Sequence, residues 1–174
     1  MNIISHSFLG IIILKILTYI RPDYFSMNIE LILLAIFFSL LPDLSGLWSK
    51  KEMHNHHTSP LHSPFFWILA TLVLLVVGVP TKYISLPIIL LFFIATECHL
   101  LSDFITGRYS GIPLLYPISK KEHSLRKLEK DNGNINPRHI HKKGYRSMTK
   151  HYFKNKYLIA FEALIWAIGI LILL

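Results

Sequence analysis

The stretch Tyr83-Ile-Ser-Leu-Pro-Ile-Ile-Leu-Leu-Phe-Phe-Ile-Ala-Thr-Glu-Cys-His-Leu-Leu-Ser-Asp-Phe-Ile105 is a long apolar run that carries ionisable residues near its end. It is long enough for a helix that crosses a membrane, which needs about 20 mostly apolar residues. Four further apolar stretches occur, at Ile3–Ile20, Ile29–Leu41, Phe65–Val79 and Tyr157–Leu174. The sequence lacks the series of alternating segments of about 10 residues that a membrane β-barrel would need. We therefore predict an all-α fold, a polytopic membrane helix bundle with about five transmembrane helices.

The composition of the chain supports this prediction. Of its 174 residues, 52% are hydrophobic and 16% are charged, whereas about 25% are charged in a soluble domain. An ordinary water-soluble globule is therefore excluded. The single cysteine, Cys98, excludes an internal disulfide and a cysteine-rich zinc cluster, so a metal would have to be held by His, Asp or Glu. The length fits one domain, and we predict a single membrane domain over residues 1–174.

Lys and Arg residues are distributed unequally between the connections that join the apolar stretches. Of the 18, 15 lie in residues 45–63 and 107–156, and the alternate connections hold only Arg21 and Lys82. Because cytoplasmic connections of membrane proteins carry an excess of positive residues, we expect both basic connections in the cytoplasm. The N-terminus is then inside and the C-terminus outside. No Lys or Arg precedes the first stretch and no small-residue cleavage pattern follows it, so we interpret it as a retained helix.

The basic cytoplasmic segment 107–156, between the fourth and fifth apolar stretches, has features of its own. Ser119-Lys-Lys-Glu122 matches a capping box, which predicts a short surface helix over Ser119–Asp131. Basic, partly amphipathic cytoplasmic segments most often lie against anionic headgroups. Membrane lipids are therefore the expected partners of this segment. Nucleic-acid binding is disfavoured because no recognition motif accompanies the charge.

Ionisable residues gather at one predicted face of the membrane. A polar ionisable group at membrane depth is costly, so it indicates function. Under the predicted topology the cytoplasmic face receives His6, Asp43, His54, His56, His57, His62, His99 and Asp103. His99 and Asp103 are four residues apart, which places both side chains on one helix face at a spacing suited to chelating one cation.

Simpler explanations exist for each of these residues alone. Asp43 follows a proline and is explained as a helix terminator in water, and His57 and His62 as solvated loop residues. A helical His-x3-Asp pair also occurs often by chance. These explanations do not account for carboxylates and imidazoles sharing one face.

Four other polar or aromatic residues receive structural interpretations. Glu97 is two residues from His99 and points to the other side of the helix, where it pairs with a neighbouring helix. Glu162 reaches the membrane interface from its helix end. Trp67 and Trp166 are interpreted as interfacial aromatics.

Five motifs in a fixed order resemble a known family. They are Ser5-His6, Leu40-Leu-Pro-Asp-Leu44, His57-Thr-Ser-Pro-Leu-His-Ser63, Cys98-His-Leu-Leu-Ser-Asp-Phe-Ile-Thr-Gly107 and Gly111-Ile-Pro-Leu-Leu-Tyr-Pro117. Over about residues 1–120 the chain resembles the YdjM-like family of inner-membrane metal-dependent hydrolases. The last block, His-x3-Asp-x2-Thr and the Leu-Leu-aromatic-Pro sequence, is the most specific part of the resemblance.

The chain departs from the family pattern at two places. The second acidic position of the Leu-Pro-Asp signature is Ser45, and the Arg-Gly of the histidine loop is replaced by Thr58-Ser59. The order His, Asp, His, His-x3-Asp is also similar to that of zinc-dependent phospholipase C. The later His-x3-Glu of those enzymes has no counterpart after Asp103, which favours one fully formed metal site.

The leading hypothesis is a membrane-bound metal-dependent hydrolase. Asp43, His57 or His62, His99 and Asp103 would hold one divalent cation, with zinc favoured by mixed imidazole and carboxylate ligands and manganese or iron also accommodated. The cation would activate water at the cytoplasmic face. His6, Asp43 and His62 are the expected catalytic residues, with the His6 imidazole as one proton acceptor. The expected substrate is a small molecule or lipid, specifically a phosphoester carried by the membrane.

Two other classes remain open from the sequence. A non-catalytic metal-binding membrane protein or ion transporter would use the same residues as an ion path, but would spread ionisable groups through the membrane depth. A structural or regulatory protein would bind a cytosolic partner through residues 107–156.

Overall fold

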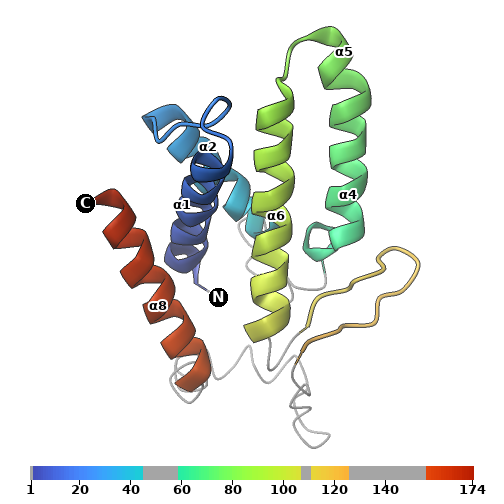
Figure 1. Cartoon of the computed structure of the whole chain (residues 1–174). Helices are drawn as coiled ribbons and strands as arrows, with labels where there is room; N and C mark the ends of the chain where they lie inside the picture. The colour runs from blue at the N-terminus through green and yellow to red at the C-terminus, as the bar shows by residue number, and fades with distance from the viewer. Residues whose placement is uncertain (1, 45–58, 107–110, 126–155) are drawn as a thin grey trace, which may run out of the picture.

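The computed structural model of the chain describes residues 2–44, 59–106, 111–125 and 156–174. The longer helices are α1 (Ile3–Ile20), α2 (Ile29–Leu40), α4 (Pro64–Val73), α6 (Leu86–Thr106) and α8 (Lys156–Leu173), shown in Figure 1. Short turns η1 (Leu41–Asp43) and η3 (Pro60–His62) follow α2 and precede α4, and η4 (Leu74–Gly78) joins α4 to α5 (Val79–Thr81). Within these ranges there is no strand, only an isolated bridge between Ile112 and His123. The predicted all-α class is confirmed.

Within the described ranges, four helical segments are long and apolar enough to cross a membrane. They are Ile3–Ile20, Pro64–Thr81, Leu86–Thr106 and Lys156–Leu173. The fold is therefore a helical membrane bundle, as expected. The second predicted span is shorter than the others, because α2 has 12 residues, about 18 Å at 1.5 Å per residue. Its start is fixed by Asn28, whose side chain accepts a hydrogen bond from the Leu31 N–H at 2.8 Å, and Pro42 lies in the turn that follows it.

The helices alternate in direction. The starts of α1, α4 and α8 and the ends of α2 and α6 lie at the same end of the bundle in Figure 1. The two basic connections therefore leave from one end, and the short connections 21–28 and 82–85 lie at the other. We call the first end the N-terminal end of the bundle.

Small residues allow α1 to approach its neighbours closely. A Cβ atom added to Gly10 would lie 2.5 Å from the Ala35 carbonyl oxygen and 2.8 Å from Ser39 Oγ of α2. A Cβ atom on Gly169 of α8 would lie 2.3 Å from a ring carbon of Phe8. Small residues at helix contacts are typical of membrane bundles, where packing replaces the hydrophobic effect. These glycines bring α2 and α8 against the helix that carries His6.

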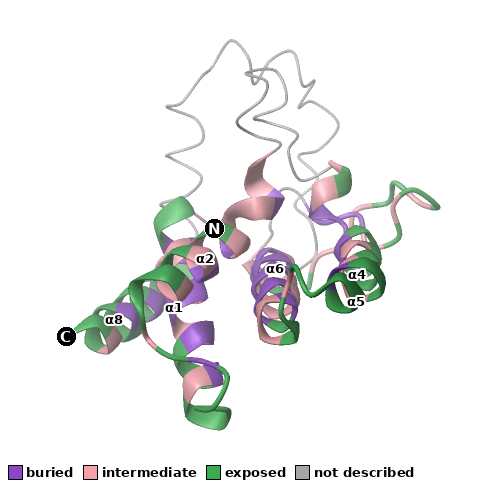
Figure 2. Ribbon diagram, turned by 90° about the horizontal axis from the view of Figure 1, so that it is seen from above, coloured by how far each residue is buried: buried purple, intermediate pink, exposed green. Residues whose placement is uncertain are grey.

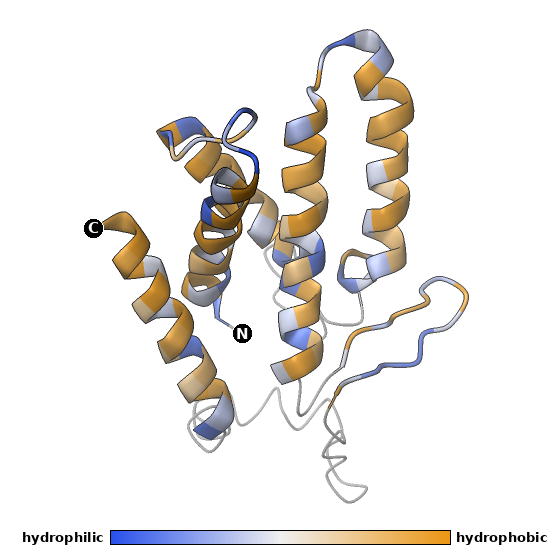
Figure 3. Ribbon diagram, viewed as in Figure 1, coloured by the Kyte–Doolittle hydropathy of each residue, from blue (hydrophilic) through white to orange (hydrophobic). Residues whose placement is uncertain are grey.

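The surface of the bundle is apolar where lipid would surround it. Figure 2 shows buried residues on the facing sides of α1, α2 and α6, with exposed residues on the outer sides of α8, α4 and α5. The hydropathy colouring of Figure 3 shows that these outer sides are mostly hydrophobic, whereas hydrophilic positions occur in the lower half of α6. The polar part of α6 is thus at the N-terminal end of the bundle.

The predicted surface helix Ser119–Asp131 is wrong over residues 119–125, which are not helical, and its remainder lies outside the described residues. Glu122 does not complete a capping box, because its carboxylate accepts a hydrogen bond from the Gly111 N–H at 3.1 Å. Ile112 and His123 exchange two backbone hydrogen bonds of 2.8 and 2.9 Å. Residues 111–125 therefore form a looped pair of extended segments that packs Ile112 against Trp67 and other apolar side chains.

Candidate metal centre

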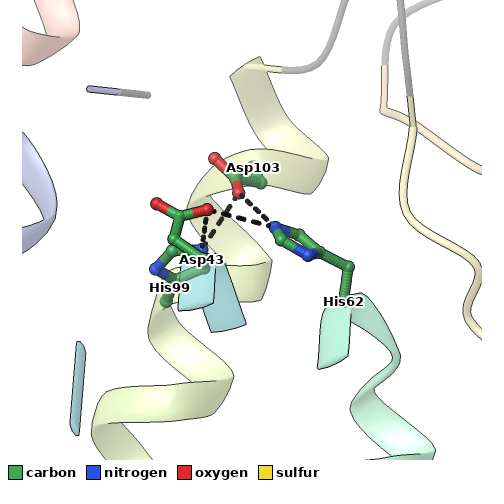
Figure 4. Close-up of side chains that lie close together, drawn as sticks. All are labelled: Asp43, His62, His99 and Asp103. Atoms are coloured by element: carbon green, nitrogen blue, oxygen red, sulfur yellow. Dashed lines mark ion pairs between the residues drawn. The ribbon is translucent and has the colours of Figure 1, made fainter. Parts of the chain in front are cut away.

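Four side chains from three separate parts of the chain meet at the N-terminal end of the bundle. Asp43 ends η1, His62 ends η3, and His99 and Asp103 lie in the last turns of α6. One ligand atom from each can be chosen so that all four atoms lie within 4.8 Å of one another. Figure 4 shows the four side chains close together, joined by ion pairs. The side chains of His62 and His99 are fully buried and that of Asp103 nearly so, while Asp43 is 21% exposed.

The position of His62 is set by its turn and by a buried tryptophan. The His62 N–H donates to the Ser59 carbonyl at 2.9 Å, and Trp67 Nε1 donates to the Leu61 carbonyl at 2.7 Å. Trp67 is 6% exposed, and its ring packs against that of Phe92 with the ring centroids 5.6 Å apart. The interpretation of Trp67 as an interfacial aromatic is therefore wrong, since it holds the residue before His62.

The orientation of His99 is set by α2. Its Nδ1 lies 2.6 Å from the Ser39 carbonyl oxygen, which accepts only, so we infer that Nδ1 carries the proton. Nε2 is buried and has no hydrogen bond among the described residues, and in the neutral imidazole, the form that binds metal, it would present its lone pair. It faces Asp103 Oδ2 at 3.2 Å and Asp43 Oδ1 at 3.6 Å. A neutral imidazole in this position needs a cation between its Nε2 lone pair and the two carboxylate oxygens.

The spacing of the four groups fits a metal ion. His62 Nε2 lies 3.3 Å from Asp43 Oδ1 and 3.8 Å from Asp103 Oδ2. Ligands about 2.0–2.2 Å from a tetrahedral zinc lie about 3.4 Å from one another. Two imidazoles and two carboxylates also form a neutral set with a divalent cation. The donor set and its geometry therefore fit a divalent metal ion.

The groups outside the membrane-spanning helices have protonation states suited to ligation. Burial alone would raise the pKa of Asp43, but the hydrogen bond with His62 and the positive charge that His99 carries when it is protonated outweigh burial and hold this pKa below its ordinary value. Burial lowers the pKa of His62, against the opposing effect of its hydrogen bond with Asp43. An ionised carboxylate and a neutral imidazole are the forms that bind metal.

His6 lies beside the four-residue group. It is fully buried, its ring stacks on that of His99 with centroids 3.7 Å apart, and its Nε2 lies 3.4 Å from Asp103 Oδ1. The two oxygens of Asp103 thus face different ways. Oδ2 faces the other ligand candidates, and Oδ1 faces His6.

The sequence of the chain matches a known protein family. A family model described as YdjM inner membrane protein matches residues 1–173. The chain belongs to the YdjM inner membrane protein family. The match extends over every helix described above, so the resemblance seen in the motifs is confirmed along nearly the whole chain. No curated protein and no solved structure matches the chain.

The structure of this YdjM family member brings together most of the residues predicted for the site. His6, Asp43, His62, His99 and Asp103 gather at one end of the bundle. His57, the alternative to His62, lies outside the described residues, as do His54, His56 and Ser45. Ser59 belongs to the second departure from the family pattern, Thr58-Ser59. It precedes the η3 turn, where its Oγ accepts a hydrogen bond from the Leu61 N–H at 3.2 Å.

Sequence reasoning missed the residues that support the site. The Ser39 carbonyl, which orients His99, leaves no signal in a side-chain pattern. Glu162 does not reach the interface as expected, because it is 2% exposed and accepts hydrogen bonds from Asn2. Trp166 donates from its indole to Ser5 Oγ at 2.8 Å. For the contacts that Glu162 and Trp166 make with the start of α1, the one signal in the sequence was a carboxylate in an apolar stretch.

Proposed function

We propose that this YdjM family member is a membrane-bound metal-dependent hydrolase that acts at the cytoplasmic face on a phosphoester-containing membrane substrate. The observation that carries the proposal is the buried Nε2 of His99, which has no hydrogen bond among the described residues and faces Asp103 Oδ2 at 3.2 Å and Asp43 Oδ1 at 3.6 Å. A buried imidazole between two carboxylates is an arrangement that a divalent cation stabilises.

Asp43, His62, His99 and Asp103 would hold the cation. Zinc is the preferred ion because it accepts mixed imidazole and carboxylate ligands and can take a water in addition to them, and manganese or iron would fit the same donor types. When bound, the ion would make a water acidic enough to attack and would polarise the scissile phosphoester. His99 is held for this role by its hydrogen bond to the Ser39 carbonyl oxygen, at 2.6 Å.

The residues around the ion would supply orientation and proton handling. His6 would hold Asp103 in place through Oδ1 and is the nearest further imidazole available to accept a proton. Asp43 is the most exposed of the four ligand candidates, at 21%, so the substrate would approach from its side. His62 bounds the same side through its contact with Asp43.

The proposed substrate follows from where the site lies. The ligand candidates lie at helix ends, at the end of the bundle from which the basic connections leave. Positive residues near a membrane surface attract anionic lipids. A phospholipid phosphoester therefore suits the site, as does the order of ligands shared with zinc-dependent phospholipase C.

The test is hydrolysis by the purified protein. In detergent micelles that contain phospholipid, zinc-loaded protein should release phosphate monoester or alcohol. Removal of metal by a chelator should abolish the activity, and re-addition of zinc should restore it. A fully loaded protein that hydrolyses no phosphoester would overturn the hydrolase proposal and leave metal binding alone.

A cytoplasmic site also makes a topological prediction. In a Cys98→Ala background, Tyr83→Cys should react with a membrane-impermeant maleimide on intact cells, because Tyr83 is 90% exposed and belongs to the connection between α5 and α6, at the opposite end of the bundle. Lys120→Cys, which is also exposed, should react only after permeabilisation. The reverse labelling pattern would place the site outside and contradict the proposed orientation.

A further inference from the structure

Glu162 is a buried carboxylate in the membrane-spanning helix α8. It is 2% exposed. Its Oε1 accepts from the Asn2 backbone N–H at 2.8 Å and its Oε2 accepts from Asn2 Nδ2 at 2.9 Å. An ionisable residue inside a membrane span is costly and therefore retained for a reason. Here both oxygens are directed at one residue, 160 positions away in the sequence.

Asn2 starts the helix that carries His6. Its Oδ1 accepts from the Ser5 N–H at 2.8 Å and from Ser5 Oγ at 3.0 Å, which makes it the N-cap of α1. The His6 N–H donates to the Asn2 carbonyl at 3.1 Å. The first backbone hydrogen bond of the turn that presents His6 therefore ends on the residue that Glu162 holds.

A second tie from α8 lies one turn further along. Trp166 Nε1 donates to Ser5 Oγ at 2.8 Å, and Gly169 packs against Phe8. Residues 162, 166 and 169 share one face of α8, so this face contacts the first two turns of α1. Packing between the two helices alone would not require hydrogen bonds that are concentrated on the residues just before His6.

We propose that Glu162 is a positioning residue that holds His6 against Asp103 Oδ1 by fixing the Asn2 cap. The inference rests on the proposed metal centre, because Asp103 is one of its ligand candidates. Without the carboxylate, both Asn2 donors lose their acceptor and the first turn of α1 frays. His6 then leaves Asp103, whose orientation toward the ion is no longer fixed.

Cobalt(II) provides the readout, since its visible absorption reports both affinity and ligand geometry. Loss of a partner that orients a metal ligand lowers metal affinity by about 10- to 100-fold. We expect Glu162→Ala and His6→Ala each to weaken cobalt binding to this degree and to change the spectrum in the same way. Since Glu162 acts through His6, the double variant should bind cobalt no more weakly than His6→Ala alone.

A side-chain exchange separates positioning from simple stability. Asn2→Asp alone places two carboxylates together, and Glu162→Gln alone sets two amides against each other, so both should weaken cobalt binding. When the two substitutions are combined, the amide introduced on α8 can donate to the carboxylate introduced at the cap, and aspartate remains a good N-cap. Cobalt binding should therefore recover. Ile165→Ala is the control, since it removes a buried apolar side chain of α8 and none of these hydrogen bonds.

The outcomes decide between the inference and the function on which it rests. Failure of the wild-type protein to bind cobalt would overturn the proposed metal centre itself. With cobalt bound, additive losses for Glu162→Ala and His6→Ala, no recovery in the exchanged pair, or an equal loss in Ile165→Ala would each overturn the positioning role of Glu162 while leaving the metal centre intact.

Discussion

Replacing Asp103 or His99 by alanine should reduce zinc affinity by more than about 100-fold, because each change removes a ligand rather than an outer partner, whose loss costs about 10- to 100-fold. Hydrolysis of phosphoesters should fall in parallel. The fold should persist, since packing between helices holds the bundle. Metal analysis of the detergent-purified variants, by mass spectrometry of bound ions, gives the measurement.

Thr96→Val is the matched control for these two variants. Thr96 is buried on α6 before His99, and within the described part of the chain its Oγ1 donates to two carbonyls of its own helix, at 2.9 and 3.0 Å. The control should keep its zinc and its activity. Wild-type zinc content in His99→Ala would refute the assignment of this residue as a ligand. Loss of ion flux in proteoliposomes, with no hydrolysis by the wild-type protein, would instead favour the transporter.

Gly10→Ala should both destabilise the protein and weaken metal binding. The new Cβ would lie 2.5 Å from the Ala35 carbonyl oxygen. This is a backbone atom, so α1 and α2 must separate, and overpacking of this kind costs about 1–3 kcal/mol. The shift also moves His6, one turn earlier on the same helix face, and Ser39, whose carbonyl oxygen is 2.6 Å from His99 Nδ1.

Thermal unfolding in detergent and zinc titration would measure the two effects of Gly10→Ala. Gly78→Ala is the matched substitution, because its Cβ would lie 3.4 Å from the nearest atom, Ile84 Cβ, an ordinary contact. It should leave both measurements close to those of the wild type. Equal behaviour of the two alanine variants would contradict the role given to the close approach of α1 and α2.

The apolar stretches predicted the helices well. Ile3–Ile20 is helical over its whole predicted length, and α8 begins and ends within one residue of Tyr157–Leu174. A membrane helix satisfies its own backbone hydrogen bonds, so the length of the apolar run sets the length of the helix. The location of the site could be predicted from the sequence for a related reason. Alternating helices carry His6, Asp43, His62 and His99 to one end of the bundle whatever the packing between helices.

The failures concern contacts between residues that are distant in the sequence. Glu122 matched a capping box, but its carboxylate found the Gly111 N–H, which no local pattern shows. Trp67 and Glu162 were interpreted from their types and places in apolar stretches, while their burial depends on which helices pack together. Local sequence patterns determine helices and shared ends, and tertiary contacts determine which polar group supports which.

The uneven exposure of the four ligand candidates bears on exchange kinetics. Asp43 is 21% exposed, whereas the side chains of His62, His99 and Asp103 are each 2% exposed or less. Among these four side chains, Asp43 is therefore the one past which a cation would enter or leave, and its movement would set the residence time of the ion. We therefore expect the bound metal to be released to a chelator much more slowly than from a site that is open at the protein surface.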